Sequence, residues 1–170
     1  MNKSVTVALA ILLLVLLIPL IGLPVSSLLK PNPPLPEITY GEFPFRIEYE
    51  INGDRVVVED TVICEFDGFG FSWGGEGKFR KWKSHLLNSE GAGSFLLLLE
   101  TVDAKLYCTV RSPAYYMGDS KSFPNEIFPP SAFTKKTKSY NFISSQELFD
   151  RYGIRFISWE FSPPIENNFG

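Results

Sequence analysis

The feature that most constrains this chain is an uncharged apolar run near its N-terminus, residues 5–23. As a helix it would be roughly 28 Å long, at about 1.5 Å per residue. That length matches the hydrocarbon thickness of a bilayer. The run has no polar face, which a helix on the surface of a folded domain would need. Lys3 precedes it, so the positive-inside rule predicts a cytoplasmic N-terminus and export of the rest of the chain.

Two fates of this segment stay open. The first is an uncleaved signal anchor over residues 1–24, with the lipid bilayer as the partner of residues 5–23. It is favoured because the run is long for a signal peptide and no Ala-x-Ala site comes after it. The second is a signal peptide cleaved near Ser27, with Pro19 and Gly22 interrupting the helix. Cleavage would release a secreted module.

The remainder divides by composition into a spacer, a domain and a tail. Residues 25–41 are rich in proline and predict an extended polyproline II linker. Residues 42–162 have the length of a single domain. Their many aromatic side chains favour a packed core over disorder. Residues 163–170 are expected to form a tail.

The clearest local signal in the domain is a β-hairpin around Asn52-Gly53. These residues favour the positive φ angles of a type I′ turn, which fixes the register of the two strands. In that register apolar side chains face each other, and so do opposite charges. The predicted pairs are Glu50 with Arg55, Tyr49 with Val56, Ile47 with Val58 and Arg46 with Glu59. We expect the charged face to meet water, where ion pairs contribute little.

A second hairpin is predicted over residues 95–110. A turn at Val102-Asp103 would pair Glu100 with Lys105, Leu99 with Leu106, Leu97 with Cys108 and Phe95 with Val110. Leu96 and Leu98 make the first strand of this hairpin apolar on both faces. We therefore expect that strand to lie centrally in a sheet and to be covered on both sides.

The C-terminal third alternates between loop and regular structure. Residues 112–141 contain four prolines and a basic run at 135–138, and they predict a long, partly ordered loop. Ser144 and Gly153 are placed to begin and end a short helix. A strand over 154–161 comes next, in which simple alternation puts Ile154, Phe156, Ser158 and Glu160 on one side.

Together these patterns predict a mainly β fold with a minor α component. It comprises an N-terminal transmembrane helix, a small antiparallel sheet domain of five to seven strands arranged as a half-barrel or sandwich, and one short C-terminal helix.

In residues 66–82 aromatic residues first alternate with glycines, and basic residues then appear from Lys78 onward. The favoured interpretation is that Phe69, Phe71 and Trp73 fill the core, while the glycines allow a bulge or bend. The alternative is a stacking platform for a glycan or apolar ligand. Its candidate ligand-binding residues are Trp73, Trp82, Tyr115 and Tyr116. The spacing fits neither a phosphate loop nor a dinucleotide fingerprint.

Other chemistry-bearing residues are few. Cys64 and Cys108 both fall in predicted core strands and predict a disulfide in an exported domain, with two buried thiols as the alternative. They and the single histidine make a poor zinc set, so we expect no metal and no cofactor. Glu65, Asp67 and Glu76 could serve a small cell-surface hydrolase or simply form a solvated rim.

The net charge of −3 argues against nucleic acid as a partner. The expected function is therefore that of a membrane-anchored extracytoplasmic domain which binds or scaffolds without catalysis. Its partners would be an envelope polymer or another membrane protein. The secreted module and the hydrolase using carboxylates near Glu65–Glu76 are the alternatives.

Overall fold

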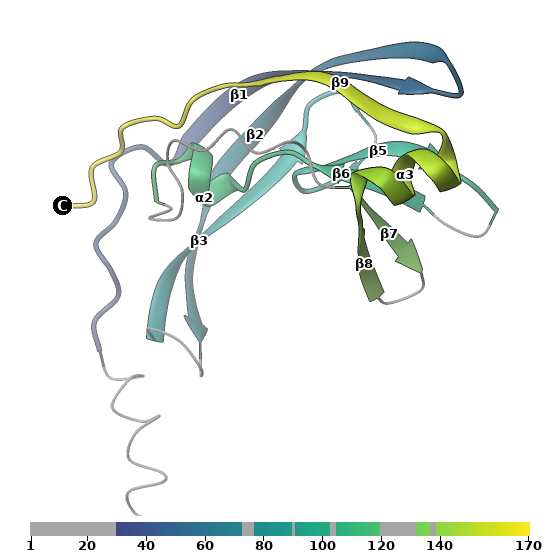
Figure 1. Ribbon diagram of the computed structural model, residues 1–170. Coiled ribbons are helices and arrows are strands. Elements are labelled where there is room, and N and C mark those ends of the chain that lie inside the picture. Colours follow the sequence, from purple (N-terminus) through teal and green to yellow (C-terminus); the bar gives the residue numbers. More distant parts are fainter. Residues whose placement is uncertain (1–29, 73–76, 90, 103–104, 120–131, 137–138) are drawn as a thin grey trace, which may run out of the picture. The chain divides into compact units, whose positions relative to one another are not determined.

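The structure is a computed structural model that describes residues 30–72, 77–89, 91–102, 105–119, 132–136 and 139–170 (Figure 1). The strands of these residues are β1 (Tyr40–Ile51), β2 (Asp54–Ser72), β3 (Gly77–Leu86), β4 (Gly91–Ala92), β5 (Phe95–Glu100), β6 (Lys105–Thr109), β7 (Ala132–Lys136), β8 (Ser139–Ile143) and β9 (Ile154–Phe161). Their helices are α2 (Pro113–Tyr116) and α3 (Ser145–Tyr152). The predicted mainly β class is confirmed, although α2 adds a second short helix.

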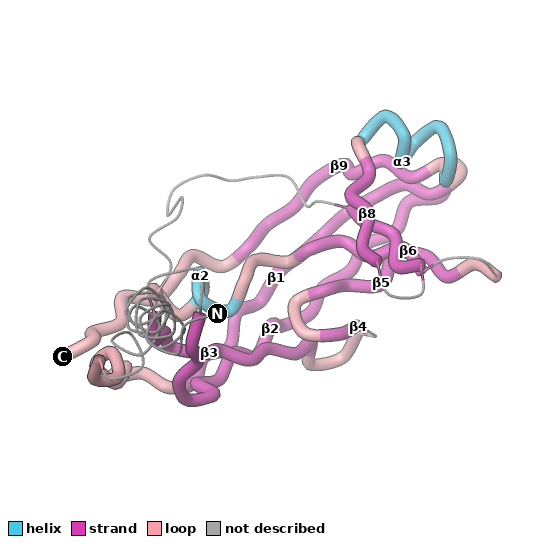
Figure 2. The backbone as a smooth tube through the Cα atoms, turned by 90° about the horizontal axis from the view of Figure 1, so that it is seen from below, coloured by secondary structure: helices cyan, strands magenta, loops and turns pink. Residues whose placement is uncertain are grey.

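The strands form two antiparallel sheets. The first has the order β3-β2-β1-β9 and the second has the order β4-β5-β6-β7-β8. Figure 2 shows how strongly strands predominate along the described chain. The chain divides into two compact units. We call Pro36–Asp67 with Trp82–Gly170 the main unit, and residues 30–35 with Gly68–Lys81 the hairpin unit.

The β1–β2 hairpin has the predicted turn and register. Asn52 and Gly53 have φ angles of 53° and 94°, as a type I′ turn requires. All four predicted cross-strand pairs are present. Strand β2 then continues from this hairpin without interruption to Ser72.

The β5–β6 hairpin has the predicted register only near its turn. Glu100 pairs with Lys105 and Leu99 pairs with Leu106, as expected. A bulge between Leu97 and Leu99 then shifts the register, so that Leu97 faces Tyr107 and not Cys108. One extra residue on one strand is enough to displace every later pair.

Strand β9 contains a second bulge that corrects the expected division of its side chains. The register between β1 and β9 shifts between Glu48 and Tyr49, so that Tyr49 faces Phe156 while Glu48 faces Ser158. Ile157 is the extra residue. As a result Trp159 joins Ile154 and Phe156 on the side that packs against the core.

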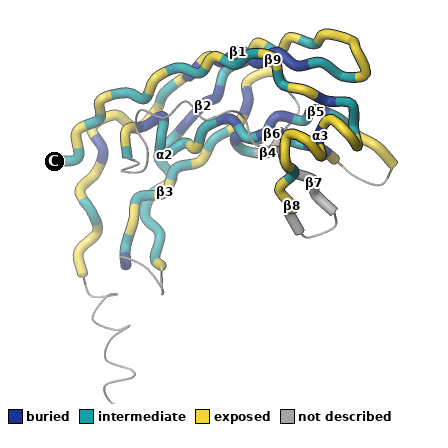
Figure 3. Tube along the Cα trace, viewed as in Figure 1, coloured by how far each residue is buried: buried dark blue, intermediate teal, exposed yellow. Residues whose placement is uncertain are grey.

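The core of the main unit takes side chains from both sheets and both helices. Figure 3 shows the buried segments on β1, β2, β5 and β6. The most deeply buried side chains include Ile47, Val62, Leu106, Leu148 and Ile154. Residues 96 and 98 of β5 are buried, but Leu97 and Leu99 are only half-buried, so the predicted cover on both sides is incomplete. Strand β5 lies second in its sheet, next to the two-residue β4.

The long, partly ordered loop predicted over residues 112–141 contains regular elements toward both its ends, whereas residues 120–131 lie outside the described residues. Ser112 caps α2, with its hydroxyl accepting a hydrogen bond from the Tyr115 amide at 3.2 Å. Farther on, β7 pairs with both β6 and β8. The prolines concealed these elements because they lie in and around short segments with little periodicity. The helix α3 was predicted well, with Ser144 at its N-cap and Gly153 at its left-handed C-cap.

The C-terminal tail is attached to the start of the domain. The Asn167 side chain hydrogen-bonds the amide and the carbonyl of Ile38 at 3.0 and 2.8 Å. The Glu37 amide donates to the Asn168 carbonyl at 2.9 Å, and the Ile165 amide donates to the backbone carbonyl of Tyr116 at 2.9 Å. The last residues therefore hold the end of the linker against the main unit.

The predicted anchor at residues 5–23 lies outside the described residues. Within the part of the chain that the structure does describe, neither helix has the length and apolar character needed to cross a bilayer.

Candidate functional site

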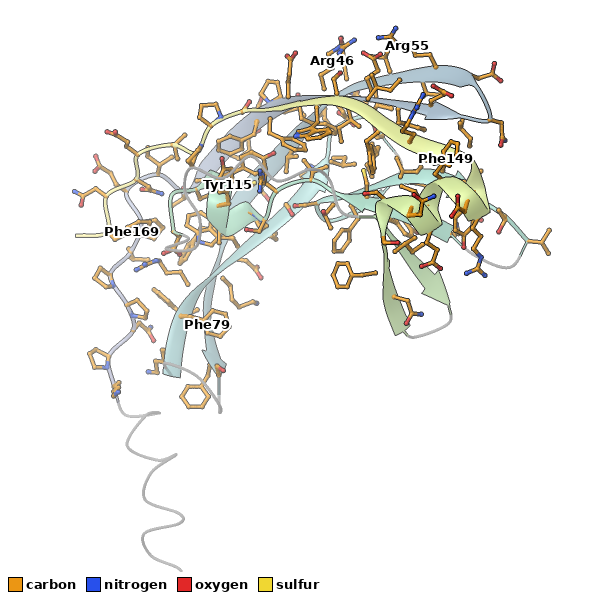
Figure 4. All side chains as sticks on the ribbon, viewed as in Figure 1. Arg46, Arg55, Phe79, Tyr115, Phe149 and Phe169 are labelled. Atoms are coloured by element: carbon orange, nitrogen blue, oxygen red, sulfur yellow. The ribbon has the colours of Figure 1, made fainter. Side chains whose placement is uncertain are left out.

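The outer face of β1 carries a charged cluster, which we call the Glu48 cluster. Glu48 is only 3% exposed although it lies on the side of β1 opposite the core. It forms ion pairs with Arg55 and, at 3.2 Å, with Arg46. The Ser158 hydroxyl donates to it at 3.4 Å. Figure 4 shows Arg46 and Arg55 projecting from this face. Arg55 and Glu59 meet water, as expected for the charged face, but Glu48 on the same face is buried.

The electrostatics of Glu48 are set by these neighbours. Burial raises the pKa of its carboxyl, but hydrogen bonds and charge attraction from Arg55 and Arg46 outweigh this effect. The net result is a pKa below the ordinary value of 4.5. Glu48 is therefore held ionised near neutral pH.

Next to this cluster lies an open depression of about 570 Å³. Arg46 lies in its wall and bonds Glu59 at 3.2 Å. Glu160, opposite Arg46 in the β1–β9 register, is exposed at the same site. The lining residues are Pro44, Phe45, Arg46, Glu59, Asp60, Thr61, Asn88, Glu160, Phe161 and Ser162.

Asp60 is one of the residues that line this depression and is itself 6% exposed. Its carboxylate accepts hydrogen bonds from the amides of Thr61 at 2.7 Å, Asn88 at 3.0 Å and Ser89 at 2.6 Å. The Asn88 side chain donates a further bond at 3.1 Å. Burial raises the pKa of Asp60, but these donors lower it more, to a value below 3.8. Asp60 thus ties the loop after β3 to β2.

This arrangement is suited to binding and support more than to proton transfer. A general acid needs a carboxyl whose pKa lies near the working pH. The carboxyls of Glu48 and Asp60 are shifted the other way. The depression is lined by charges of both signs and by apolar side chains. Arg46 lies between Glu59 and Glu160 in the register of the three strands, and Phe161 lines the depression beside them.

The predicted aromatic platform is only partly a surface. Trp82 is half-buried, its indole N–H donates to Asp119 at 2.8 Å, and its ring meets Phe66 edge-on at 5.5 Å. Tyr115 is half-buried beneath the Arg111 guanidinium, 5.4 Å from its ring centre. Trp73 lies outside the described residues.

Tyr116 is not part of any surface. It is fully buried and stacks on Phe43, with ring centres 4.5 Å apart. Burial raises the pKa of its hydroxyl. The helix α2 turns this side chain inward while Tyr115 stays at the boundary, so the structure assigns the two adjacent tyrosines to different environments.

Cys64 and Cys108 are both completely buried members of the core and are free thiols in the structure. Burial raises the pKa of each thiol from 9.0 to about 12, so neither is a nucleophile near neutral pH. The disulfide stays a prediction.

The carboxylates near the glycine-rich stretch do not form a described site. Glu65 pairs with Lys83 at 2.8 Å, and Glu76 lies outside the described residues. No group of three potential metal ligands occurs among the residues that the structure describes.

Two features of the site were missed from the sequence. The burial of Glu48 depends on Ser158 and Arg55, and the first of these lies on a strand that comes 110 residues later. The burial of Asp60, in contrast, could have been predicted from the sequence. It alternates with Val58 and Val62, so it occupies an inward position where a carboxylate needs several donors.

Comparison with known proteins gives no family assignment. No family model matches the chain, and neither the curated proteins nor the solved structures yield a match.

Proposed function

We propose that this protein is a single-pass membrane protein whose N-terminal segment anchors a β-rich binding or scaffolding domain outside the cytoplasm. The observation that carries the proposal is the charge-free run at residues 5–23, preceded by Lys3 and succeeded by a proline spacer. Such a run is stable in lipid and fixes the orientation of the domain attached to it.

The chemistry of the main unit supports binding over catalysis. Its buried carboxylates serve as acceptors for fixed donors, and its buried thiols have raised pKa values. The depression beside Arg46 presents polar and charged groups of both signs. These properties suit a hydrated partner such as an envelope polymer or the polar surface of another membrane protein.

The anchor is tested by topology and extraction. Epitope tags at Met1 and at Gly170 are expected to differ in protease access, with only the second cleaved in intact cells. The chain should stay with the membrane in alkaline carbonate. Cleavage of the first tag in intact cells, or release of the chain by carbonate, contradicts the proposal.

The secreted alternative is separated by sequencing the N-terminus of the mature chain. A mature chain that begins near Val25–Ser27 establishes the secreted module, and an intact N-terminus supports the anchor. The hydrolase alternative predicts an activity that is lost when Asp67 and Glu76 are replaced.

Binding at the depression is tested with Glu160→Ala and Arg46→Ala against isolated cell-envelope polymer and detergent-solubilised envelope proteins. Both variants are expected to weaken retention of the full chain. The control is Arg155→Ala, which removes a charge from the same outer face but does not line the depression. Equal retention of all three variants would remove the depression as the binding site.

A further inference from the structure

The hairpin unit differs in charge from the rest of the chain. Its described residues include Lys30, Lys78, Arg80 and Lys81 and contain no acid. Glu76 is the one acidic residue that the sequence adds between residues 68 and 81. The hairpin is therefore basic in a chain whose net charge is −3.

The hairpin also keeps a large ring at its surface. Phe79, on β3, is 45% exposed (labelled in Figure 4). Its ring lies over Gly70 of the adjacent strand β2, so closely that a Cβ at residue 70 would collide with it. Because residue 70 has no side chain, the Phe79 ring can pack directly against the backbone of β2.

The strands present aromatic residues on both sides. Successive side chains of a strand point to opposite faces. Phe69 and Phe71 therefore face away from the side on which Gly70 receives Phe79. Both are half-buried. Lys78 and Arg80 flank Phe79 in the sequence, which interleaves basic and aromatic side chains along this strand.

The linker is held against this hairpin. The Arg80 guanidinium donates to the Pro34 carbonyl at 3.2 Å. Pro34 comes eleven residues after the end of the apolar run at Leu23. Eleven extended residues reach at most about 40 Å. The contact therefore limits the separation between the hairpin and the end of the apolar run to about the 40 Å that these residues can reach.

We infer that the β2–β3 hairpin, through Phe79, Lys78 and Lys81, docks on the surface of the anionic bilayer that holds the anchor. Aromatic rings are favoured at the headgroup level of a bilayer, and lysines beside them are attracted to anionic lipid. This inference rests on the proposed membrane anchor. It adds that the hairpin is held at the bilayer surface and is not freely tethered.

The test uses the full-length chain in vesicles that contain phosphatidylcholine brominated near the headgroup, with or without phosphatidylglycerol. Phe79→Trp introduces a fluorescent ring at the hairpin. Val57→Trp, at a position 47% exposed on β2 in the main unit, is the matched control. After subtraction of the native signal, the Phe79→Trp variant should be quenched in phosphatidylglycerol vesicles, and the control should keep its fluorescence.

Neutralising Lys78 and Lys81 to glutamine should lower the ratio of docked to undocked hairpin by about fivefold for each charge. Quenching should fall accordingly, and added salt should reproduce the effect. In the unmodified chain, amide exchange at residues 77–81 should be slower in vesicles with phosphatidylglycerol than in those without it. Because this measurement uses the unmodified chain, it tests docking even if Phe79→Trp perturbs folding.

Three results overturn the inference. The two tryptophan variants could be quenched equally, quenching could be the same without phosphatidylglycerol, or exchange at residues 77–81 could be unaffected by it. All three measurements are made on chains that resist carbonate extraction from the vesicles. A negative result then counts against docking of the hairpin and not against the anchor. Release by carbonate instead counts against the proposed anchor.

Discussion

The two faces of β1 are equally well buried at their centre but are held by different forces. The inner face buries Phe45, Ile47 and Tyr49 in the core shared by both sheets. On the outer face Glu48 reaches the same degree of burial among the charged and polar groups of Arg46, Arg55 and Ser158. The inner face should therefore respond to changes of volume, and the outer face to changes of charge, pH and salt.

The largest effect should come from the centre of the inner face. Ile47→Ala should lower the free energy of unfolding by about 3–4 kcal/mol, because Ile47 is completely buried and a cavity would remain. Ile47→Val, the control, should cost about 1 kcal/mol. Urea unfolding measures both. Similar losses for the two variants would show that this face does not depend on volume.

Asp60 is a second test of how the two faces differ, because it is a charged side chain in an inward position of β2. Asp60→Asn should lower stability by about 2 kcal/mol, because an amide cannot accept all the bonds that Thr61, Asn88 and Ser89 donate. Glu59→Gln is the matched control, with a side chain 71% exposed on the adjacent outward position. It should change stability by less than about 1 kcal/mol.

The pH dependence of this loss is set by the lowered pKa of Asp60. The folded protein binds this proton less well than the unfolded chain, so the stabilisation is complete above the ordinary pKa of 3.8. It is lost as the pH falls through the lower pKa of the folded state. Unfolding midpoints of the native protein and Asp60→Asn should therefore differ at pH 7 and converge in acid. A constant difference would argue against an ionised Asp60.

Local sequence signals predicted the parts of the fold that depend on neighbouring residues. Asn52-Gly53 set a register that is correct along the whole β1–β2 hairpin. The caps of α3 were equally local. The bulges next to Leu98 and at Ile157 were not predicted, because the alternation of side chains carries no sign of an extra residue. Bulges are chosen by the packing of strands that meet only in the folded protein.

The candidate site was harder to predict from the sequence than the fold, because it depends even more on contacts between residues that are distant in the chain. The hairpin register brought Arg46 and Glu59 together, and that ion pair is present. The depression also needs Glu160 and Asn88 from other elements, and no local pattern links them. Tyr115 and Tyr116 show the same limit. The sequence alone could not separate a boundary residue from a core residue in a four-residue helix.

Glu48 is the direct counterpart of Ile47 on the outer face. Glu48→Gln should lower the urea midpoint by less than Ile47→Ala does, because it keeps the side-chain volume and removes only the charge that Arg46 and Arg55 neutralise. Glu48→Gln combined with Arg55→Ala should be less damaging than the sum of the two single changes. Strict additivity in this cycle would show that the two side chains do not interact.

The smallest effect is expected where the outer face opens to solvent. Arg155 pairs with Glu50 at 2.9 Å, but its side chain is 63% exposed. Arg155→Ala should change stability by about 0.5 kcal/mol or less, and high salt should remove even that difference. Glu48→Gln should keep most of its effect in the same salt, because a buried pair is screened much less than an exposed one. Urea unfolding of both variants at low and high ionic strength makes the comparison. A salt response that is equal for the two positions would mean that Glu48 is solvated after all, and the contrast between the faces of β1 would then reduce to apolar burial alone.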